Sequence, residues 1–364
     1  MHSVYIHIPF CKSICTYCDF CKVLKNPYFV TPYLNSLIKE INEKYDNETI
    51  ETLYIGGGTP SALDIKNLKY LLETCKIFKL SSNYEFTFEC NVNDINDELL
   101  DILKEYGVNR LSIGIESFDN NKLEFMGRRH DVKEVEEKIK LVRSHGFDNI
   151  NLDLIYGIPK ESVGTLKKDL KEIIKLNPEH ISTYSLIIED NTVIGNTKMV
   201  PIDEDLDYEM YETIIKTLKK HGYVHYEVSN FSKPGFESQH NTNYWKNREY
   251  YGFGVGAHGY IGNVRYENTR SIVNYINGRT VLNQEVLSKK DTMDNEIMLG
   301  FRLLKGLNLQ EFYDKYEVNI QEVYDLKPLL KDKELIYKDG YLFINPELIY
   351  VMNEILIKII KFSR

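Results

Sequence analysis

The feature that most constrains the fold of this chain is a repeated alternation of apolar runs and amphipathic helical patterns over its first two thirds. Each strand-like run is followed by a polar segment whose apolar residues recur with a period near 3.6. The six predicted strands cover residues 3–8, 52–55, 84–89, 110–115, 149–155 and 180–187. Such a rhythm requires right-handed crossovers and a parallel sheet. We therefore expect an α/β fold, an open or partial (β/α)6 barrel. A doubly wound sheet is the alternative, because a sequence does not show closure.

Two helical segments illustrate the pattern. After the first strand, Thr31 is predicted to be the N-cap of a helix with Pro32 at its first position. The apolar stripe of this helix is formed by Leu34, Leu37, Ile38 and Ile41. A similar stripe before the sixth strand is formed by Leu166, Leu170, Ile173 and Ile174. Both stripes are typical of helices that pack on a sheet.

The alternation stops near residue 230, which suggests three parts. Residues 1–230 are the predicted barrel, 231–285 form a connecting segment rich in glycine and aromatic residues, and 286–364 form a smaller, mainly helical C-terminal subdomain. Within the last part, the sequence "YKDGYLFINPE" predicts a hairpin with its turn at Asp339-Gly340.

Charge and hydropathy exclude several classes of protein. A formal net charge of −9 argues against an electrostatic nucleic-acid binder, which needs a basic face. No run approaches the ~18 apolar residues of a membrane span, so only peripheral contact with a membrane is compatible with the chain. The N-terminus also lacks the order of a signal peptide. We expect a cytoplasmic protein.

Four of the six cysteines lie within eleven residues, in "FCKSICTYCDFC". This clustering does not suit a secreted disulfide framework and indicates a metal or redox site. The spacing of Cys11, Cys15 and Cys18 suits thiolate ligation of an iron–sulfur cluster. A structural zinc site is the rival, although no second Cys/His knuckle is evident. Three ligands would leave one iron of a [4Fe–4S] cube open to a substrate, unless Cys21 supplies a fourth.

Further candidate residues follow the predicted strands. The glycines of "YIGGGTPS" let the backbone approach a charged ligand closely. Polar residues at or just after other strands are Glu89, Glu116, Arg128 and Asp153. Active sites of β/α barrels are built at this end of the strands. Any one of these charges alone is more often a solvated or capping residue, but together they form a constellation.

The C-x3-C-x2-C spacing, with Tyr17 before the third cysteine, resembles the radical S-adenosylmethionine (SAM) superfamily. In that superfamily SAM chelates the open iron, and an electron from the cluster cleaves it to methionine and a 5′-deoxyadenosyl radical. The resemblance implies that Cys11, Cys15 and Cys18 hold a [4Fe–4S] cluster. It also implies that Cys21 is not a ligand.

Several longer motifs resemble one branch of this superfamily. They include "YIHIPFC", "GGGTPS", "RLSIGIESF", "GRRH", "NLDLIYGIP", "HNTNYW" and "GFGVGAHG". The branch contains the oxygen-independent coproporphyrinogen III oxidases and the haem chaperones of the HemW family. Carried over by position, the resemblance implies that SAM is bound among Tyr5, Tyr17, Phe20, Gly57, Gly58, Thr59, Glu89, Glu116, Arg128 and Asp153. Glu116 replaces the glutamine that the family usually has, which keeps a polar group but adds charge.

Two features favour the chaperones over the oxidases. Only ten residues precede Cys11, whereas the oxidases have a longer extension, and Phe20 stands where they have a fourth cysteine. The chain also has the "HNxxYW" motif, which implies that His240, Tyr244 and Trp245 contact haem. Read without the resemblance, His240 is an ordinary hydrogen-bonded histidine and the aromatic residues are core.

The resemblance thus implies a haem-binding chaperone with a [4Fe–4S] cluster and SAM. Its implied partners are haem-accepting proteins, such as those of the respiratory chain, and a reductant such as flavodoxin or ferredoxin. The alternatives are an oxidase that decarboxylates coproporphyrinogen III propionates and a zinc-stabilised binding module without enzymatic activity. The late "GVGAHG" formally matches a dinucleotide motif, but no helical pattern follows it, so we expect a tight turn there.

Overall fold

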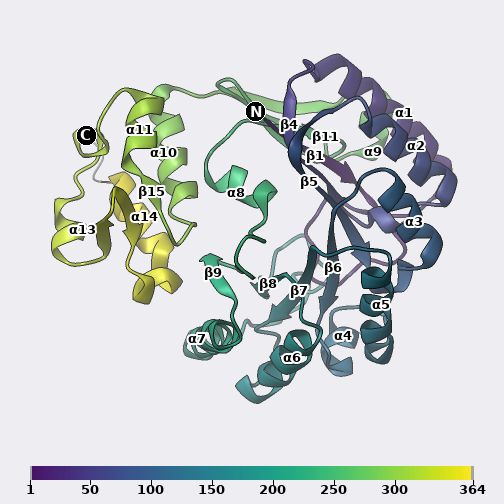
Figure 1. The fold of residues 1–364 in the computed structure, drawn as a ribbon, viewed down its shortest axis with the longest axis horizontal. Helices are drawn as coiled ribbons and strands as arrows, with labels where there is room; N and C mark the ends of the chain where they lie inside the picture. Colours follow the sequence, from purple (N-terminus) through teal and green to yellow (C-terminus); the bar gives the residue numbers. More distant parts are fainter. Residues whose placement is uncertain (1, 362–364) are drawn as a thin grey trace.

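The computed structural model describes residues 2–361 and contains a curved sheet of 12 strands (Figure 1). All six predicted strands are present, pair in parallel and follow one another in sequence order across the sheet. They are β1 (His2–Ile8), β4 (Thr49–Gly57), β5 (Lys79–Asn91), β6 (Arg110–Glu116), β7 (Ile150–Tyr156) and β8 (His180–Ser185). Sequential parallel pairing is what repeated right-handed crossovers produce.

The sheet is an open barrel, which confirms the predicted class. The intervening helices line the outer, convex side of the sheet (Figure 1). They are α1 (Pro27–Lys44), α2 (Ile65–Cys75), α3 (Asp97–Glu105), α5 (Val132–Ser144) and α6 (Val163–Lys175). A doubly wound sheet would carry helices on both faces. The two ends of the sheet do not pair with each other, because β14 (Val281–Val286) and β9 (Val224–Glu227) are its separate edges.

Strand alternation gives this barrel an apolar outer face and a polar interior. The outward side chains, such as Ile55 and Leu111, are fully buried in the hydrophobic core beneath the helices. Their neighbours along the strands point inward, where the hydroxyl of Tyr54 donates to Glu89 and the amide of Asn151 donates to Ser112. A period of two residues therefore separates the packing face from the face that can bind a polar ligand.

The start of the first helix differs from the prediction. Helix α1 begins at Pro27 with Asn26 as its N-cap, whose side chain accepts from the amide of Tyr28. Thr31 is therefore not the cap, and Pro32 lies inside the helix. The same two signals, an N-cap residue and a proline at the first helical position, also occur five residues before Thr31, at Asn26 and Pro27. The helix begins there because the Asn26 side chain accepts from an amide that would otherwise have no partner. The predicted stripe holds, since Leu34, Leu37 and Ile41 are buried and Ile38 is partly buried.

Residues after 230 contribute both to the barrel sheet and to a separate C-terminal region. Strand β11 (Tyr250–Phe253) pairs in parallel with β1, and β12 (His258–Ile261), β13 (Val264–Asn268) and β14 extend the sheet beyond it. The "GVGAHG" segment, residues 254–259, runs into β12 and not into a helix, as expected.

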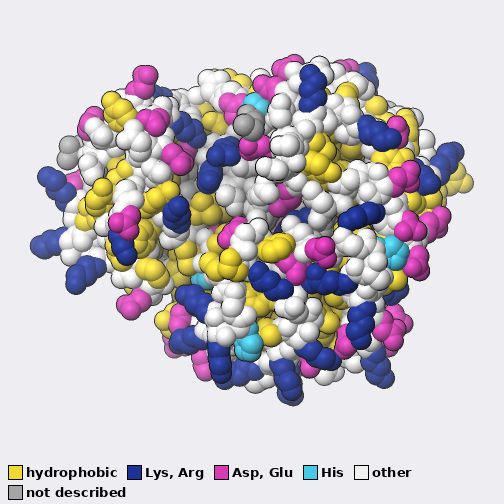
Figure 2. All heavy atoms as spheres, viewed as in Figure 1, with side chains coloured by type: hydrophobic (Ala, Val, Ile, Leu, Met, Phe, Trp, Pro, Cys, Tyr) yellow, Lys and Arg dark blue, Asp and Glu magenta, His cyan; other side chains and the backbone are white. Residues whose placement is uncertain are grey.

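The C-terminal region contains short helices from α10 (Lys289–Gly300) to α14 (Met352–Lys361). The predicted hairpin is confirmed as β16 (Leu335–Lys338) and β17 (Tyr341–Ile344), with positive φ at both turn residues. On the face shown in Figure 2, acidic and basic side chains are interspersed over the barrel and the C-terminal region. Among residues 2–361, no helix has the length and apolar composition needed to cross a membrane.

Candidate functional site

The cysteine loop follows β2 (Phe10–Cys11), directly after β1, at the carboxyl end of the barrel strands. Cys11, Cys15 and Cys18 are free thiols. Burial raises the pKa of Cys11 to about 11, and it also raises that of Cys18. These thiols act on one another, since Cys15 and Cys18 raise the pKa of Cys11 further. Three soft sulfur donors on one loop fit an iron–sulfur cluster, and metal binding would have to displace their protons.

The glycine loop after β4 packs tightly on the chain that leads from β1 into the cysteine loop. The amide of Gly58 donates to Ile8 O at 2.8 Å, and the amide of Thr59 donates to Phe10 O at 2.9 Å. A Cβ atom on Gly57 would lie 2.4 Å from the ring of His7, and one on Gly58 would lie 2.7 Å from the backbone of Pro9. These contacts require glycine, because any side chain would push the glycine loop away from the end of β1.

A chain of hydrogen bonds links the first cysteine to Arg128. The Thr59 hydroxyl donates to the Cys11 sulfur at 3.5 Å and accepts from Asn91 at 3.2 Å. The oxygen of the Asn91 amide accepts from Arg128 at 2.7 Å. Asn91 ends β5 two residues after Glu89, so the two side chains share the inward face of the sheet. The sequence analysis did not single out Asn91, although this spacing from Glu89 would have predicted it as a site residue.

Arg128 also joins two predicted residues from other elements. Its guanidinium forms an ion pair with Glu116 and donates to the Tyr17 hydroxyl at 3.3 Å. Glu116 ends β6 at a φ of 66°, a left-handed conformation unusual for a residue with a side chain. The strand register shifts beside it, so this bulge aims the carboxylate at Arg128. The family's usual glutamine would carry no charge at this position. The negative charge of Glu116 is paired with the guanidinium of Arg128.

Two further acids complete the polar interior. Glu89 accepts from the Tyr54 hydroxyl at 2.7 Å and from the Gly57 amide at 2.9 Å, while burial raises its pKa. Burial, followed by the charge of Glu116, raises the pKa of Asp153 to about 7. Asp153 is therefore protonated in a large fraction of molecules near neutral pH, which lets it donate as well as accept a hydrogen bond.

His7, which the sequence analysis did not single out, bridges Tyr5 and Cys21 by hydrogen bonds. The Tyr5 hydroxyl lies 2.9 Å from His7 Nδ1, and His7 Nε2 lies 2.6 Å from Cys21 O. A carbonyl only accepts, so His7 carries its proton on Nε2 and accepts from Tyr5. The Cys21 sulfur donates to Arg270 O at 3.4 Å, a partner outside the cysteine loop. By contrast Phe20 is 66% exposed, and its side chain is on the outer surface of the loop.

The "HNxxYW" motif forms helix α8 (Gln239–Trp245) within the concave side of the sheet (Figure 1). His240 is only 1% exposed. Its Nδ1 lies 2.7 Å from the Thr52 hydroxyl and its Nε2 lies 2.8 Å from the Tyr244 hydroxyl. Burial lowers the pKa of His240 to about 3, so the ring is neutral. In this arrangement both ring nitrogens of the predicted haem ligand are occupied.

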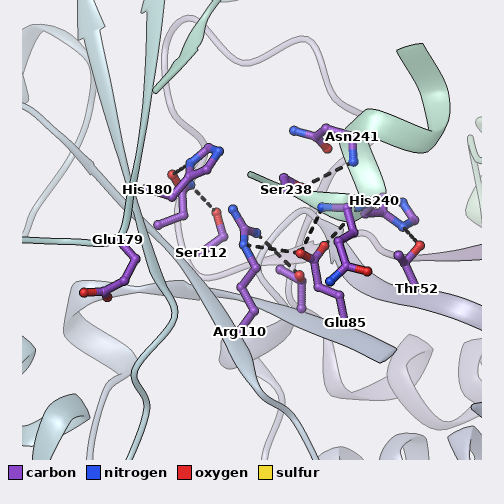
Figure 3. A network of polar contacts seen from close by, with 12 residues as sticks. Thr52, Glu85, Arg110, Ser112, Glu179, His180, Ser238, His240 and Asn241 are labelled. Atoms are coloured by element: carbon purple, nitrogen blue, oxygen red, sulfur yellow. Dashed lines mark hydrogen bonds and ion pairs between the residues drawn. The ribbon is translucent and has the colours of Figure 1, made fainter. Parts of the chain in front are cut away.

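Helix α8 is fixed to the barrel at its N-terminus as well (Figure 3). Both oxygens of Glu85 accept from backbone amides, from Gln239 at 3.0 Å and from His240 at 3.0 Å. A carboxylate at a helix N-terminus satisfies amides that lack partners within the helix. The same interior layer contains His180, whose Nδ1 lies 2.6 Å from Asn151 Oδ1. The motif is thus anchored in a buried polar network, and the side chain of Trp245 is partly buried.

Comparisons with known proteins agree with this geometry. A model of the radical SAM superfamily matches residues 5–173, and a model of the HemN C-terminal domain matches residues 287–349. The chain is 40% identical over 348 residues to the heme chaperone HemW of Lactococcus lactis subsp. lactis (strain IL1403), covering 93% of this chain and 91% of that relative. The chain belongs to the HemW family of radical SAM proteins. Another relative, the heme chaperone HemW of Bacillus subtilis (strain 168), is 40% identical over 87% of both chains.

A solved structure shares the fold of this HemW-family chain. The Escherichia coli coproporphyrinogen III oxidase HemN superposes with a TM-score of 0.85 over 98% of this chain and 89% of that chain, at 21% identity. This likeness confirms the fold. Membership of the radical SAM superfamily implies a [4Fe–4S] cluster, SAM and a source of electrons.

Proposed function

We propose that this protein binds haem together with a [4Fe–4S] cluster and SAM, and that it delivers haem to acceptor proteins, such as those of the respiratory chain. The observation that carries the proposal is the 40% identity over 93% of the chain to a protein named heme chaperone. The proposed setting is the cytoplasm, with flavodoxin or ferredoxin as reductant.

The cofactors would be held at the carboxyl end of the barrel strands. Cys11, Cys15 and Cys18 are the proposed cluster ligands, and the cluster would supply the electron that cleaves SAM. The residues proposed to contact SAM are Tyr5, Tyr17, Phe20, Gly57, Gly58, Thr59, Glu89, Glu116, Arg128 and Asp153. Eight of the ten belong to the hydrogen-bonded or ion-paired network described above, or to the packed glycine loop beside it. Phe20 would have to fold inward from its exposed position, and Asp153 lies deeper, bonded to Asn151 at 2.8 Å.

Within this site, different side chains would bind different parts of the ligand. Arg128 is held by Asn91, Tyr17 and Glu116, so its position is fixed before a ligand arrives. Glu89 is oriented by Tyr54 and the Gly57 amide, which leaves its remaining lone pairs for an ammonium group. Asp153 can hold or accept a proton near pH 7.

The haem site proposed at His240, Tyr244 and Trp245 requires a local rearrangement. Iron would have to replace the Tyr244 hydroxyl at Nε2 of His240, because the Nδ1 side is closed by Thr52. The buried Nε1 of Trp245 has no hydrogen-bond partner among the described residues. A motion of α8 that opens the His240–Tyr244 contact would therefore expose two aromatic faces and one imidazole to a porphyrin.

Anaerobic reconstitution tests the proposal. The reconstituted protein should bind haem with a saturable Soret absorbance change, and haem should move from it to an acceptor apoprotein. A parallel incubation with SAM, dithionite and coproporphyrinogen III should yield no porphyrin that has lost propionate carboxyls. Decarboxylated product would establish the oxidase instead, and zinc in place of iron would establish a binding module.

A further inference from the structure

Lys122 is a buried cation that none of the proposed cluster, SAM and haem sites includes. It is 6% exposed. Its Nζ donates to Glu161 Oε1 at 2.6 Å, to Asp169 Oδ2 at 2.8 Å and to Ile155 O at 3.2 Å. Both carboxylates are also buried. We call Lys122, Glu161 and Asp169 the lysine triad.

Stability alone does not explain the lysine triad. Two carboxylates share one ammonium group, and burial raises the pKa of Glu161 although the charge of Lys122 opposes this shift. Removing charged groups from water is costly, so a buried ion cluster seldom stabilises a fold more than apolar side chains of the same volume would. What such a cluster adds is a defined geometry, because its hydrogen bonds are directional.

The triad joins the chain segments that directly follow two barrel strands. Asp169, on α6, accepts from the Ser117 hydroxyl at 2.8 Å and from the Phe118 amide at 2.8 Å. These two residues come directly after Glu116, at the bulge that ends β6. Glu161, in the loop after β7, accepts from a backbone amide of the same loop at 3.1 Å. The triad therefore fixes the carboxyl end of the barrel beside the proposed SAM site.

Lys122 lies on α4 (Asn120–Phe125), the short helix after β6, and the end of this helix contacts the cysteine loop. Thr16 lies in that loop, between the second and third cysteines. Its hydroxyl donates to Phe125 O at 2.8 Å, and its amide donates to Met126 O at 3.0 Å. A movement of α4 would therefore move the proposed cluster ligands on either side of Thr16.

The same helix also holds Arg128 of the proposed SAM site. The amide of Arg128 donates to Leu123 O at 2.8 Å. Leu123 and Met126 belong to a small hydrophobic cluster separate from the main core, and Tyr17 of the cysteine loop packs against it. Apolar packing is not directional, so it does not by itself fix the position of α4 on the barrel. The lysine triad supplies directional contacts between α4 and the strand ends.

We propose that Lys122 is a positioning residue, which holds the cysteine loop and Arg128 in the relative position that binding of SAM to the cluster requires. The proposal rests on the proposed function, in which the cluster and Arg128 contact one SAM molecule. The ammonium group of Lys122 bonds to Glu161, Asp169 and Ile155 O, so it acts through α4.

The test uses Lys122→Met, which removes the charge and keeps an unbranched side chain. Arg143→Met is the matched control, because Arg143 donates to Glu179, a buried carboxylate directly before β8 at the opposite, amino end of the barrel strands. Both variants remove an ion pair, so both should lower the free energy of unfolding in urea.

The affinity for SAM distinguishes position from stability. It is measured on the reconstituted, reduced protein from the change that SAM causes in the electron paramagnetic resonance spectrum of the cluster. We expect Lys122→Met to raise the SAM dissociation constant by about tenfold or more, because a small displacement in a preorganised site has a large effect. Arg143→Met is distant from the site and should change the constant by less than about twofold.

Hydrogen exchange of the cluster-free protein tests the same inference without iron or SAM. Mass spectrometry of peptides that contain Thr16 should show its amide exchanging at least about tenfold faster in Lys122→Met, because the local contact to Met126 O opens more often. Arg143→Met should leave this amide unchanged. A protein that binds no iron would reject the proposed function, and the exchange of Thr16 would still decide the role of Lys122.

An unchanged SAM dissociation constant or an unchanged exchange of Thr16 in folded Lys122→Met would overturn the positioning role. Equal losses in Lys122→Met and Arg143→Met would also overturn it, because lowered stability would then be the cause. If Lys122→Met does not fold, Glu161→Gln takes its place, since it keeps the shape of the side chain and replaces an ion pair with a weaker neutral hydrogen bond. Glu161→Gln should weaken SAM binding by about threefold and speed the exchange of Thr16, and no change in either would overturn the proposal.

Discussion

His240 Nε2 and the Tyr244 hydroxyl lie 2.8 Å apart, one helical turn from each other on α8. The spacing of the two motif residues by four positions places them on one face of the helix. Their hydrogen bond closes the only side of the imidazole that Thr52 leaves free. In the proposed haem site, iron could therefore reach the imidazole only after this hydrogen bond opens.

The first prediction concerns haem affinity. Tyr244→Phe removes the competing hydroxyl and keeps the ring, so it should raise haem affinity several-fold, whereas His240→Ala should abolish the Soret shift of a ligated haem. His240→Ala leaves the Thr52 hydroxyl buried and unpaired, at a cost of about 1–3 kcal/mol in the free energy of unfolding. Urea unfolding should accompany the spectroscopy as a control for folding. Equal haem spectra from both variants and the unaltered protein would remove His240 from the haem site.

The second prediction concerns the cluster ligands. Cys21→Ala should retain about four irons per chain after anaerobic reconstitution, because its sulfur is bonded to Arg270 O and not directed to the other thiols. Cys15→Ala should lose most of the iron. The iron content per chain of both variants is measured by inductively coupled plasma analysis, with protein quantified by amino-acid analysis. Iron loss in Cys21→Ala would show that the fourth cysteine is a ligand.

The third prediction concerns the Thr59 hydroxyl. Its hydrogen bond to the Cys11 sulfur favours the more negative, reduced cluster, so Thr59→Val should lower the midpoint potential by on the order of 50 mV, roughly one tenfold factor in the reduction equilibrium. Thr59→Ser retains the hydroxyl and should stay close to the unaltered protein. Redox titration followed by electron paramagnetic resonance gives the potentials. An unchanged potential in Thr59→Val would mean that the contact does not tune the cluster.

The fourth prediction concerns the stability of the cluster-free protein against pH. The pKa of Asp153 is raised from 3.8 to about 7, so between these values the folded state binds more protons than the unfolded state. The contribution of Asp153 to the free energy of unfolding must therefore decrease as pH rises through this window. Asp153→Asn should remove that decrease.

Urea unfolding at pH 5 and pH 8 measures this effect. The difference in unfolding free energy between the two pH values should change by at least about 1.4 kcal/mol in Asp153→Asn, the equivalent of one pKa unit. Asp148→Asn, at an exposed position, is the control and should resemble the unaltered protein. The comparison between variants cancels the opposing contribution of buried histidines, whose lowered pKa values make stability fall toward acid pH. Equal pH dependence in all three proteins would show that Asp153 is ionised in the folded state.

The sequence determined the six parallel strands, the apolar stripes of the helices and the three-cysteine loop. These features are encoded within short stretches, because side-chain periodicity and ligand spacing are local properties of the chain. The N-cap of α1 shows the limit even of local reasoning, since Asn26 with Pro27 and Thr31 with Pro32 offer the same signal and only the folded chain selects one.

The tertiary structure decided which polar side chains meet. Asn91 connects Thr59 to Arg128, and His240 meets Thr52, a residue 188 positions away along the chain. It also decided that Phe20 is exposed while His130 is buried with an unpaired nitrogen. Hydrogen-bond partners and burial depend on which strands become neighbours and how their ends converge. No periodicity along the sequence records those distances, so the site's chemistry appears only once the barrel has formed.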